Sequence, residues 1–197
     1  KNLNIEIQQD KKLLILGNGP SLTKDIERIK LISKNCDIFA VNYFGLSDYF
    51  YKVKPNFYFL FDSKFWSNKV NEKIRSNVKT LFQKLESVNW DMVLICNKEG
   101  YSKLKVISIK NKHIKLIKVE NNPCDLKLES LHLYAIRNYL CTPNFGRGVL
   151  ILALWYAIMI GKKDIELYGA DFSQFKEFEI DQRNNNTITN ESHFYPF

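Results

Sequence analysis

Short apolar runs that end in turn residues alternate along this chain with segments of longer apolar period, and this alternation limits the fold most strongly. The short runs are typical of buried strands, and the longer period is typical of helices. We therefore expect an α/β fold, a single Rossmann-like domain with a mostly parallel central sheet and helices on both faces. The predicted strands span 11–18, 36–42, 55–63, 91–97 and 163–171, and the predicted helices span 21–33, 68–87, 129–140 and 146–161.

Two regions depart from this alternation. The stretches "KVISI" (105–109) and "IKLIKVE" (114–120) alternate in polarity, which predicts an edge hairpin or the strands of a lid. The polar, Asn-rich tail from 170 to 197 predicts a lid-like loop at the active site. With 197 residues and a hydrophobic fraction of 45%, we expect one domain over 1–197. The chain begins with Lys and ends at "SHFYPF", so residues can be missing at either end, and we expect truncation at the C-terminus.

Charge and apolar length restrict the surroundings of the protein. The longest apolar run, at 149–160, has twelve residues, which suits a buried helix better than a bilayer span. No secretory signal segment is visible in this sequence, and the four cysteines lack metal spacing, which favours reduced thiols in a cytoplasmic protein. The net charge of +8 fits phosphate-bearing ligands, nucleic acid or an anionic membrane face, and equally a Lys- and Asn-rich proteome.

The turn Gly17-Asn18-Gly19-Pro20-Ser21 separates a predicted strand from a predicted helix. Glycines permit close backbone approach, and a helix N-terminus offers unpaired N–H groups with partial positive charge. Ser21 is placed to cap that helix. The turn has neither the G-x-G-x-x-G pattern nor the lysine of a Walker loop, so a phosphate-binding turn and a structural turn remain equally compatible with it.

Further polar residues end the other predicted strands. Asn42, Asp62 with Ser63, and Asp171 each follow an apolar run. Ligands of open α/β sheets gather at the carboxyl ends of the strands, where such side chains can bind ribose hydroxyls or a base edge. Asn and Asp are also common turn formers, but their recurrence at one expected edge favours a nucleotide site.

The blocks "LLILGNGPSL", "DIFAVNYF", "NFYFLFDSKFW", "GVLILALWYAIMIGKKDIELYGADFS" and "SHFY" resemble, in order and spacing, those of the bacterial family 42 sialyltransferases. They are also similar to the related MptE-like group (domain of unknown function 115), which includes flagellin-modifying glycosyltransferases. The resemblance covers most of the chain except 98–140. It implies a Rossmann-like domain that uses a CMP-activated sugar as donor and transfers it to a glycan with inversion and without a metal.

The resemblance also implies roles for individual residues. The Gly17–Ser21 turn would line the donor phosphate or ribose, and Asn42 matches a donor-binding asparagine of the family. Gly148 matches a glycine at a helix start, and Arg147 stands where the family has serine; there it would pair with a phosphate or carboxylate or simply face solvent. The implied donor-binding set is Gly17, Asn18, Gly19, Pro20, Ser21, Asn42, Asp62, Ser63, Arg147, Gly148, Gly169, Asp171, Ser173 and Lys176.

The chain departs from the family pattern near its end. Ser173 and Glu179 stand where the family has two tyrosines that stabilise the departing phosphate. The Glu179 carboxylate would repel a phosphate, and Lys176 could supply the positive charge that offsets this repulsion. The family's general-base histidine corresponds to Phe197, which leaves His193 as the candidate catalytic base. His113 and His132 fit surface or packing roles better.

No Asp-x-Asp motif occurs, so we expect no metal site and no cofactor beyond the donor substrate. The leading hypothesis is a glycosyltransferase of lipooligosaccharide, O-antigen or capsule synthesis that transfers a nonulosonic acid such as sialic acid. Its partners would be a glycan or lipid-linked acceptor, the inner face of the inner membrane and a second copy of the chain, with no nucleic acid. The alternatives are an MptE-like diphosphotransferase acting on a pterin and a non-enzymatic nucleotide-binding module.

Overall fold

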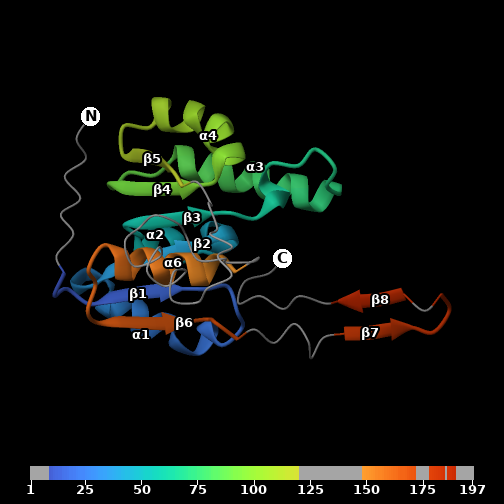
Figure 1. Ribbon diagram of the computed structural model, residues 1–197, viewed down its shortest axis with the longest axis horizontal. Helices are drawn as coiled ribbons and strands as arrows, with labels where there is room; N and C mark the ends of the chain where they lie inside the picture. The colour runs from blue at the N-terminus through green and yellow to red at the C-terminus, as the bar shows by residue number, and fades with distance from the viewer. Residues whose placement is uncertain (1–8, 120–147, 172–177, 185, 190–197) are drawn as a thin grey trace, which may run out of the picture.

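The computed structural model describes residues 9–119, 148–171, 178–184 and 186–189. A six-stranded sheet forms its centre, with strand order β5-β4-β3-β2-β1-β6 and every neighbouring pair parallel. Figure 1 shows the strands side by side with helices in front and behind. The strands are β1 (Leu13–Leu16), β2 (Asp37–Val41), β3 (Phe57–Leu60), β4 (Met92–Cys96), β5 (Ile114–Lys118) and β6 (Ile165–Tyr168).

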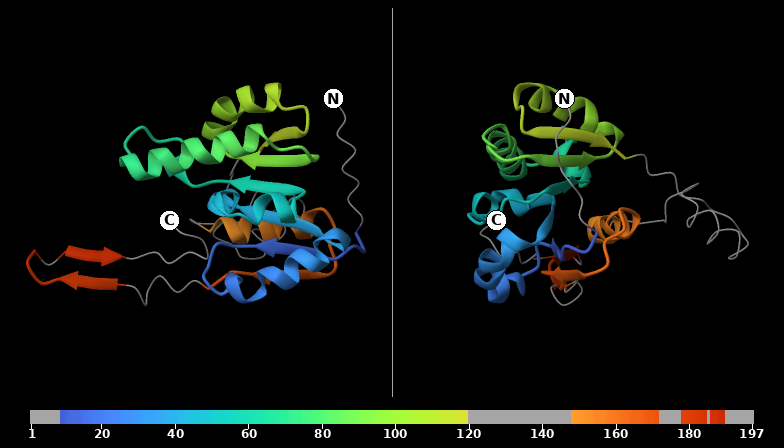
Figure 2. Two further views of the ribbon diagram at one scale, coloured as in Figure 1. Left: turned by 180° about the vertical axis from the view of Figure 1, so that it is seen from behind. Right: turned by 90° about the vertical axis from the view of Figure 1, so that its left-hand side faces the viewer.

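Helices cover both faces of this sheet. On one face lie α1 (Leu22–Ile32), α2 (Phe50–Val53), α3 (Glu72–Glu86) and α4 (Lys98–Lys110), whose apolar side chains share a core with Leu14, Ile38 and Leu94. On the other face α6 (Val149–Met159) packs over β1, β2 and β3. The edge-on view in Figure 2 separates these two helix layers. The α/β fold with a parallel sheet and helices on both faces is therefore confirmed.

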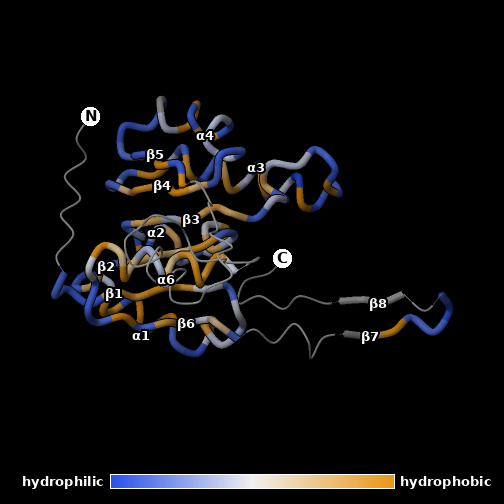
Figure 3. The backbone as a smooth tube through the Cα atoms, in the orientation of Figure 1, coloured by the Kyte–Doolittle hydropathy of each residue, from blue (hydrophilic) through white to orange (hydrophobic). Residues whose placement is uncertain are grey.

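The inner strands, β1 to β4, are almost entirely apolar, which fits the covering of both of their faces by helices. In β1 to β4 every residue is buried, as expected for parallel strands between two helix layers. Figure 3 shows these strands and α6 as largely hydrophobic, and many of the connecting segments as hydrophilic. On the α6 face, Phe39 packs against Phe57 with ring centroids 4.7 Å apart, and Tyr156 of α6 packs against Phe59 at 5.7 Å. These contacts fix α6 over the middle of the sheet.

The prediction of a strand at 105–109 was wrong, whereas an edge strand within 114–120 was confirmed. Residues 105–109 belong to α4, and β5 is a parallel edge strand rather than part of a hairpin or lid. Leu104 and Ile107, three residues apart, face the core and give α4 its buried side, while Asn97 accepts a hydrogen bond from Gly100 N at 2.9 Å and caps its first turn. The alternation within five residues concealed this helical period.

The prediction of a loop over the whole tail was also wrong. The strands β7 (Phe178–Asp181) and β8 (Asn186–Thr189) form a separate antiparallel hairpin. The Asp181 carboxylate accepts a hydrogen bond from Arg183 N at 2.9 Å, a local bond that favours a turn at this position. The alternating sequences "FEID" and "TIT" were the available strand signal.

Three short 3₁₀ segments complete the described chain: η1 (Ser33–Asn35), η2 (Asn42–Leu46) and η3 (Ser63–Phe65). Within the described residues no helix has both the length and the apolar character that crossing a membrane requires. The predicted helix at 129–140 lies outside the described residues.

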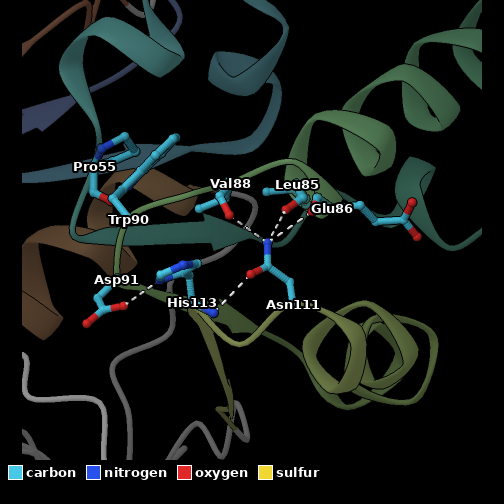
Figure 4. A network of polar contacts seen from close by, with 8 residues as sticks. All are labelled: Pro55, Leu85, Glu86, Val88, Trp90, Asp91, Asn111 and His113. Atoms are coloured by element: carbon cyan, nitrogen blue, oxygen red, sulfur yellow. Dashed lines mark hydrogen bonds and ion pairs between the residues drawn. The ribbon is translucent and has the colours of Figure 1, made fainter.

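We call the end of the sheet where the strands begin the amino edge. Three buried polar side chains that the structure describes there, Asp37, Asn111 and Lys162, are paired. Lys162, with its side chain 1% exposed, forms an ion pair with Asp37 and donates to Lys11 O at 3.1 Å, and Lys11 Nζ lies 2.9 Å from the other Asp37 oxygen. At the opposite side of this edge Asn111 donates to the carbonyls of Leu85, Glu86 and Val88, which end α3 (Figure 4). Ion pairs and hydrogen bonds of buried polar groups thus connect neighbouring segments at the amino edge.

Candidate functional site

The topology gives the sheet one switch point, between β1 and β6. The chain steps outward from β1 through β5 in order, and β6 then pairs with the other side of β1. Ligands of open α/β sheets bind outside the carboxyl ends of the strands at such a point. The residues that follow β1 and β6 here are the Gly17–Ser21 turn and the segment Gly169–Asp171. We call this end of the sheet the carboxyl edge.

The two glycines of the turn are required by the chain's own backbone. Gly17 N donates to Tyr168 O at 2.8 Å, and Gly19 N donates to Gly169 O at 2.9 Å. A Cβ at Gly17 would lie 2.9 Å from the Gly169 carbonyl carbon, and a Cβ at Gly19 would lie 2.8 Å from the Gly169 carbonyl oxygen and still closer to the Asp171 carboxylate. Gly169 itself has φ +63°, in the left-handed region. The glycines therefore bring β1 and β6 into contact.

The N-terminus of α1 holds a carboxylate from β6. Asp171 Oδ2 accepts hydrogen bonds from Ser21 N at 3.1 Å and from Ser21 Oγ at 2.9 Å. The Ser21 side chain forms no capping bond to the helix, so the prediction that Ser21 caps α1 was wrong. The Asp171 carboxylate instead occupies the position at this helix N-terminus where an anion would bind. A ligand at this position meets an exposed carboxylate, which favours hydroxyl donors over phosphate.

Asn18 joins β1 to β2 and keeps one atom unpaired. Its amide nitrogen donates to Val41 O at 3.1 Å, which holds the turn against the end of β2. Its Oδ1 is buried and has no hydrogen-bond partner in the part of the chain that the structure describes. A buried amide oxygen without a partner loses the free energy of a hydrogen bond, so a donor from a ligand would be stabilising here.

Asn42 joins β2 to β3 in a strained conformation. Its φ of +46° is in the left-handed region, which non-glycine residues rarely adopt. Its Oδ1 accepts from Phe61 N at 3.1 Å, and its carbonyl accepts from the Tyr58 hydroxyl. Tyr58 OH in turn accepts from Gly45 N at 2.9 Å, and burial raises the pKa of Tyr58. These hydrogen bonds connect η2 to β3 and fix its position at the carboxyl edge.

Two other buried groups without partners lie in segments that follow strands. Ser47 Oγ comes directly after η2, and Trp66 Nε1 directly after η3; both are buried without a hydrogen-bond partner among the described residues. Asp62 begins η3 and accepts from Lys64 N at 2.9 Å, while Ser63 is exposed. Trp66 thus adds an unpaired polar atom after β3 to that of Asn18 after β1. The Ser47 carbonyl accepts from Lys84 in the last turn of α3, so Ser47 lies toward the amino edge.

The structure brings several predicted residues into one row across β6, β1, β2 and β3. Gly17, Asn18, Gly19, Ser21, Gly169 and Asp171 are linked by direct hydrogen bonds or contacts, and Asn42 follows through Val41. Gly148 begins α6, and Leu150 of its first turn lies 3.1 Å from where a Cβ of Gly17 would stand. Pro20 lies within the same turn. Arg147, Ser173, Lys176, His193 and the Glu179 side chain lie outside the described residues.

Of the remaining groups considered from the sequence, His113 and two cysteines are described, and His132 lies outside the described residues. His113 lies at the amino edge, where its Nδ1 is 2.9 Å from Asp91 Oδ1. Cys36 and Cys96 are buried free thiols, and burial raises the pKa of Cys96 to about 12. In the part of the chain that the structure describes, no three His, Cys, Asp or Glu side chains are grouped as metal ligands.

Sequence reasoning missed Tyr58, Ser47 and Trp66. Tyr58 lies in an apolar strand, and its sequence context predicts only a core residue. The fold brings its hydroxyl within hydrogen-bonding distance of Asn42 O and Gly45 N. No local pattern indicates that the Ser47 and Trp66 side chains lack partners.

Comparison with known proteins gives one informative result. No protein-family model matches the sequence, and no curated protein matches it significantly. Among solved structures, the chain is similar to one titled as the MAf glycosyltransferase from Magnetospirillum magneticum AMB-1, with a TM-score of 0.53 and 14% sequence identity. The match covers 96% of this chain and 29% of that one, so this chain spans under a third of that structure. At this identity the likeness shows the fold.

Proposed function

We propose that this chain is the nucleotide-sugar-binding domain of a glycosyltransferase that transfers a nonulosonic acid, such as sialic acid, from a CMP-activated donor to a surface glycan. The observation that carries the proposal is the buried, unpaired Oδ1 of Asn18 at the switch point of the sheet. That position is where α/β sheets bind nucleotides. The structural neighbour named as a glycosyltransferase supports the same class.

The charges at the carboxyl edge favour one orientation of the donor. The Asp171 carboxylate would repel a phosphate, but it accepts hydrogen bonds readily from ribose hydroxyls. We therefore place the nucleoside against Asn18 and Asp171, and the phosphate away from the Asp171 carboxylate. Arg147 and Lys176 are the cationic residues that the family resemblance assigns to the phosphate. Two cationic side chains suit a monophosphate leaving group, whose charge is smaller than that of a diphosphate.

Transfer would proceed by a single displacement. The acceptor hydroxyl oxygen attacks the anomeric carbon of the donor sugar, the bond from that carbon to the phosphate oxygen breaks, and CMP leaves with the bonding electron pair. His193 would take the proton of the attacking hydroxyl as general base. The new bond forms on the face opposite the departing phosphate, so configuration inverts.

Nucleotide binding tests the site directly. We expect CMP to bind in the absence of Mg²⁺ and to bind more tightly than UDP or ATP in isothermal titration. Asn18→Ala removes the unpaired acceptor and should weaken CMP on the order of tenfold, because one hydrogen bond is lost. Asn35→Ala, at an exposed asparagine in η1, is the matched control. Equal CMP affinity in the two variants would contradict the site.

Turnover tests the chemistry separately. With CMP-sialic acid and a lactose acceptor, His193→Ala should bind CMP normally and lose transfer by about 100-fold or more, the range of general-base contributions. His113→Ala, whose ring pairs with Asp91 at the amino edge, should keep full activity. Normal turnover in His193→Ala would remove His193 from this role.

The same titrations separate the alternatives. Binding of ATP that requires Mg²⁺ would favour diphosphate transfer to a pterin, the activity implied by the MptE-like resemblance. A response to a single-stranded oligonucleotide, with none to mononucleotides, would favour a nucleic-acid-binding module.

A further inference from the structure

One strongly basic stretch of the chain lies on the side of the sheet farthest from the switch point. Between residues 98 and 118 there are seven lysines and one acidic residue, Glu99. This stretch forms α4 and β5, and β5 is the outermost strand on that side. Figures 1 and 2 show α4 and β5 together at the end of the molecule opposite α1 and β6.

The packing of α4 directs part of these lysines to the free edge. Leu104 and Ile107 face the core, and Lys103 donates to Trp66 O, so the Lys103 side of the helix faces η3 and α3. Ser108 Oγ donates to Ile114 O at 3.0 Å, so the other side faces β5. At about 100° per residue, Lys98 and Lys105 lie on the β5 side of the helix.

The turn before β5 and the strand itself carry two more lysines. Lys112 precedes β5, and Lys115 lies within it, on the sheet face opposite to the one that packs against α4. Both are exposed, as are Lys98 and Lys105. None of these four lysines forms an ion pair with a carboxylate of the described residues. We call Lys98, Lys105, Lys112 and Lys115 the edge lysines. Lysine on an edge strand also discourages strand pairing, but this accounts for Lys115 alone.

We propose that the edge lysines bind the surface of an anionic lipid bilayer and hold the protein there with its sheet edge toward the membrane. Lysines near such a surface each add attraction that does not require a shaped pocket, and a row along a protruding edge can approach the headgroups together. Val106, 55% exposed on the outer side of α4, adds apolar contact. No aromatic ring is exposed among the described residues of α4 and β5, which disfavours the base stacking that single-stranded nucleic acid requires.

This placement leaves the carboxyl edge accessible. β5 is separated from β1 by β4, β3 and β2, so the switch point lies on the order of 20 Å from the membrane-facing strand. Bilayer binding does not depend on the nucleotide site, and either one can fail without the other.

Vesicle binding tests the proposal. The 197-residue chain is sedimented with phosphatidylcholine vesicles and with vesicles that also contain phosphatidylglycerol, at low and high salt. We expect binding only to the anionic vesicles and its loss at high salt. Changing the four edge lysines to glutamine should weaken binding by on the order of 100-fold or more.

The control removes the same charge elsewhere. Lys24, Lys34, Lys73 and Lys79 are exposed on α1, η1 and α3, and their change to glutamine should leave most of the binding. Equal losses in the two variants would show a net-charge effect and overturn the proposal. It would also be overturned by equal binding to neutral vesicles, or by binding to an oligonucleotide without binding to vesicles. CD spectra and melting temperatures of both variants check that the fold is kept.

Discussion

The two edges of the central sheet use polar residues in opposite ways. At the amino edge, the Lys162–Asp37 pair and the Asn111 amide are buried and fully bonded. At the carboxyl edge, Asn18 keeps a buried oxygen without a partner among the described residues, Asn42 has a positive φ, and Asp171 is exposed. Stable proteins pair their buried polar groups, and unpaired or strained groups tend to lie where ligands bind. This difference is consistent with a stabilising role for the amino edge and with the ligand site that we propose at the carboxyl edge.

Removing Asp37 should give the largest effect on stability. Asp37→Ala leaves the buried Lys162 charge without its carboxylate, and loss of one partner of a buried pair costs about 3–5 kcal/mol. Urea denaturation measures the loss, and CMP affinity of the folded variant should be unchanged. Asp164→Ala, at an exposed residue 3.5 Å from Lys12, is the control and should cost under about 1 kcal/mol. Equal costs would mean that the buried pair is no more important than a surface pair.

Asn111→Ala should come next. The substitution leaves the carbonyls of Leu85, Glu86 and Val88 without their shared donor and removes the acceptor of His113 N, for a cost of about 2–3 kcal/mol (Figure 4). Thermal unfolding by circular dichroism measures it. Asn35→Ala should change the melting temperature little, and a similar small change in Asn111→Ala would show that the network is not stabilising.

Asn18→Ala should reverse the pattern. Because the substitution removes one hydrogen bond but also an unpaired buried oxygen, the free energy of unfolding should change by less than about 1 kcal/mol. CMP binding should nevertheless fall about tenfold. Unfolding and titration on the same preparation separate the two quantities. A large loss of stability with unchanged CMP affinity would place Asn18 with the structural asparagines.

Glu166→Gln should have the smallest effect, and it should depend on pH. The hydrogen bond from Lys12 and the one from the Tyr168 hydroxyl lower the pKa of Glu166 below its usual value of 4.5. A lowered folded-state pKa stabilises the protein above the unfolded value, and this contribution is lost as pH falls through the folded value. We expect a cost under about 1 kcal/mol at neutral pH that shrinks as the pH falls below 4.5 and through the lowered pKa of the folded state. A cost that is independent of pH would show that the charge of Glu166 is not involved.

Much of the fold follows from local patterns. The strands at 13–16, 37–41, 57–60 and 92–96 are short apolar runs that end in turn residues, so their positions were predictable without tertiary information. The helix α4 and the hairpin β7–β8 were missed because a few alternating residues satisfy both periods. In α4 the decision came from Leu104 and Ile107, which pack onto the sheet.

The candidate site was predictable only as a set of residue types. Glycines and polar residues after strands pointed to Gly17–Ser21, Asn42 and Asp171, but their partners could not be read from the chain. In the structure, Gly17 and Gly19 allow the Gly169 backbone to pack against the turn, and Ser21 N at the start of α1 donates to the Asp171 carboxylate. Both contacts join residues about 150 positions apart, which no local pattern encodes.

The amino-acid order was sufficient for the kind of fold, because apolar period and turn chemistry act within a few residues of one another. Which polar atoms are paired depended on how the strands align, since hydrogen bonds across the sheet need both partners within about 3 Å. Register and strand order left Asn18 Oδ1 without a partner among the described residues, and they brought Asp37 next to Lys162. Packing over the whole domain therefore set the difference between the two edges.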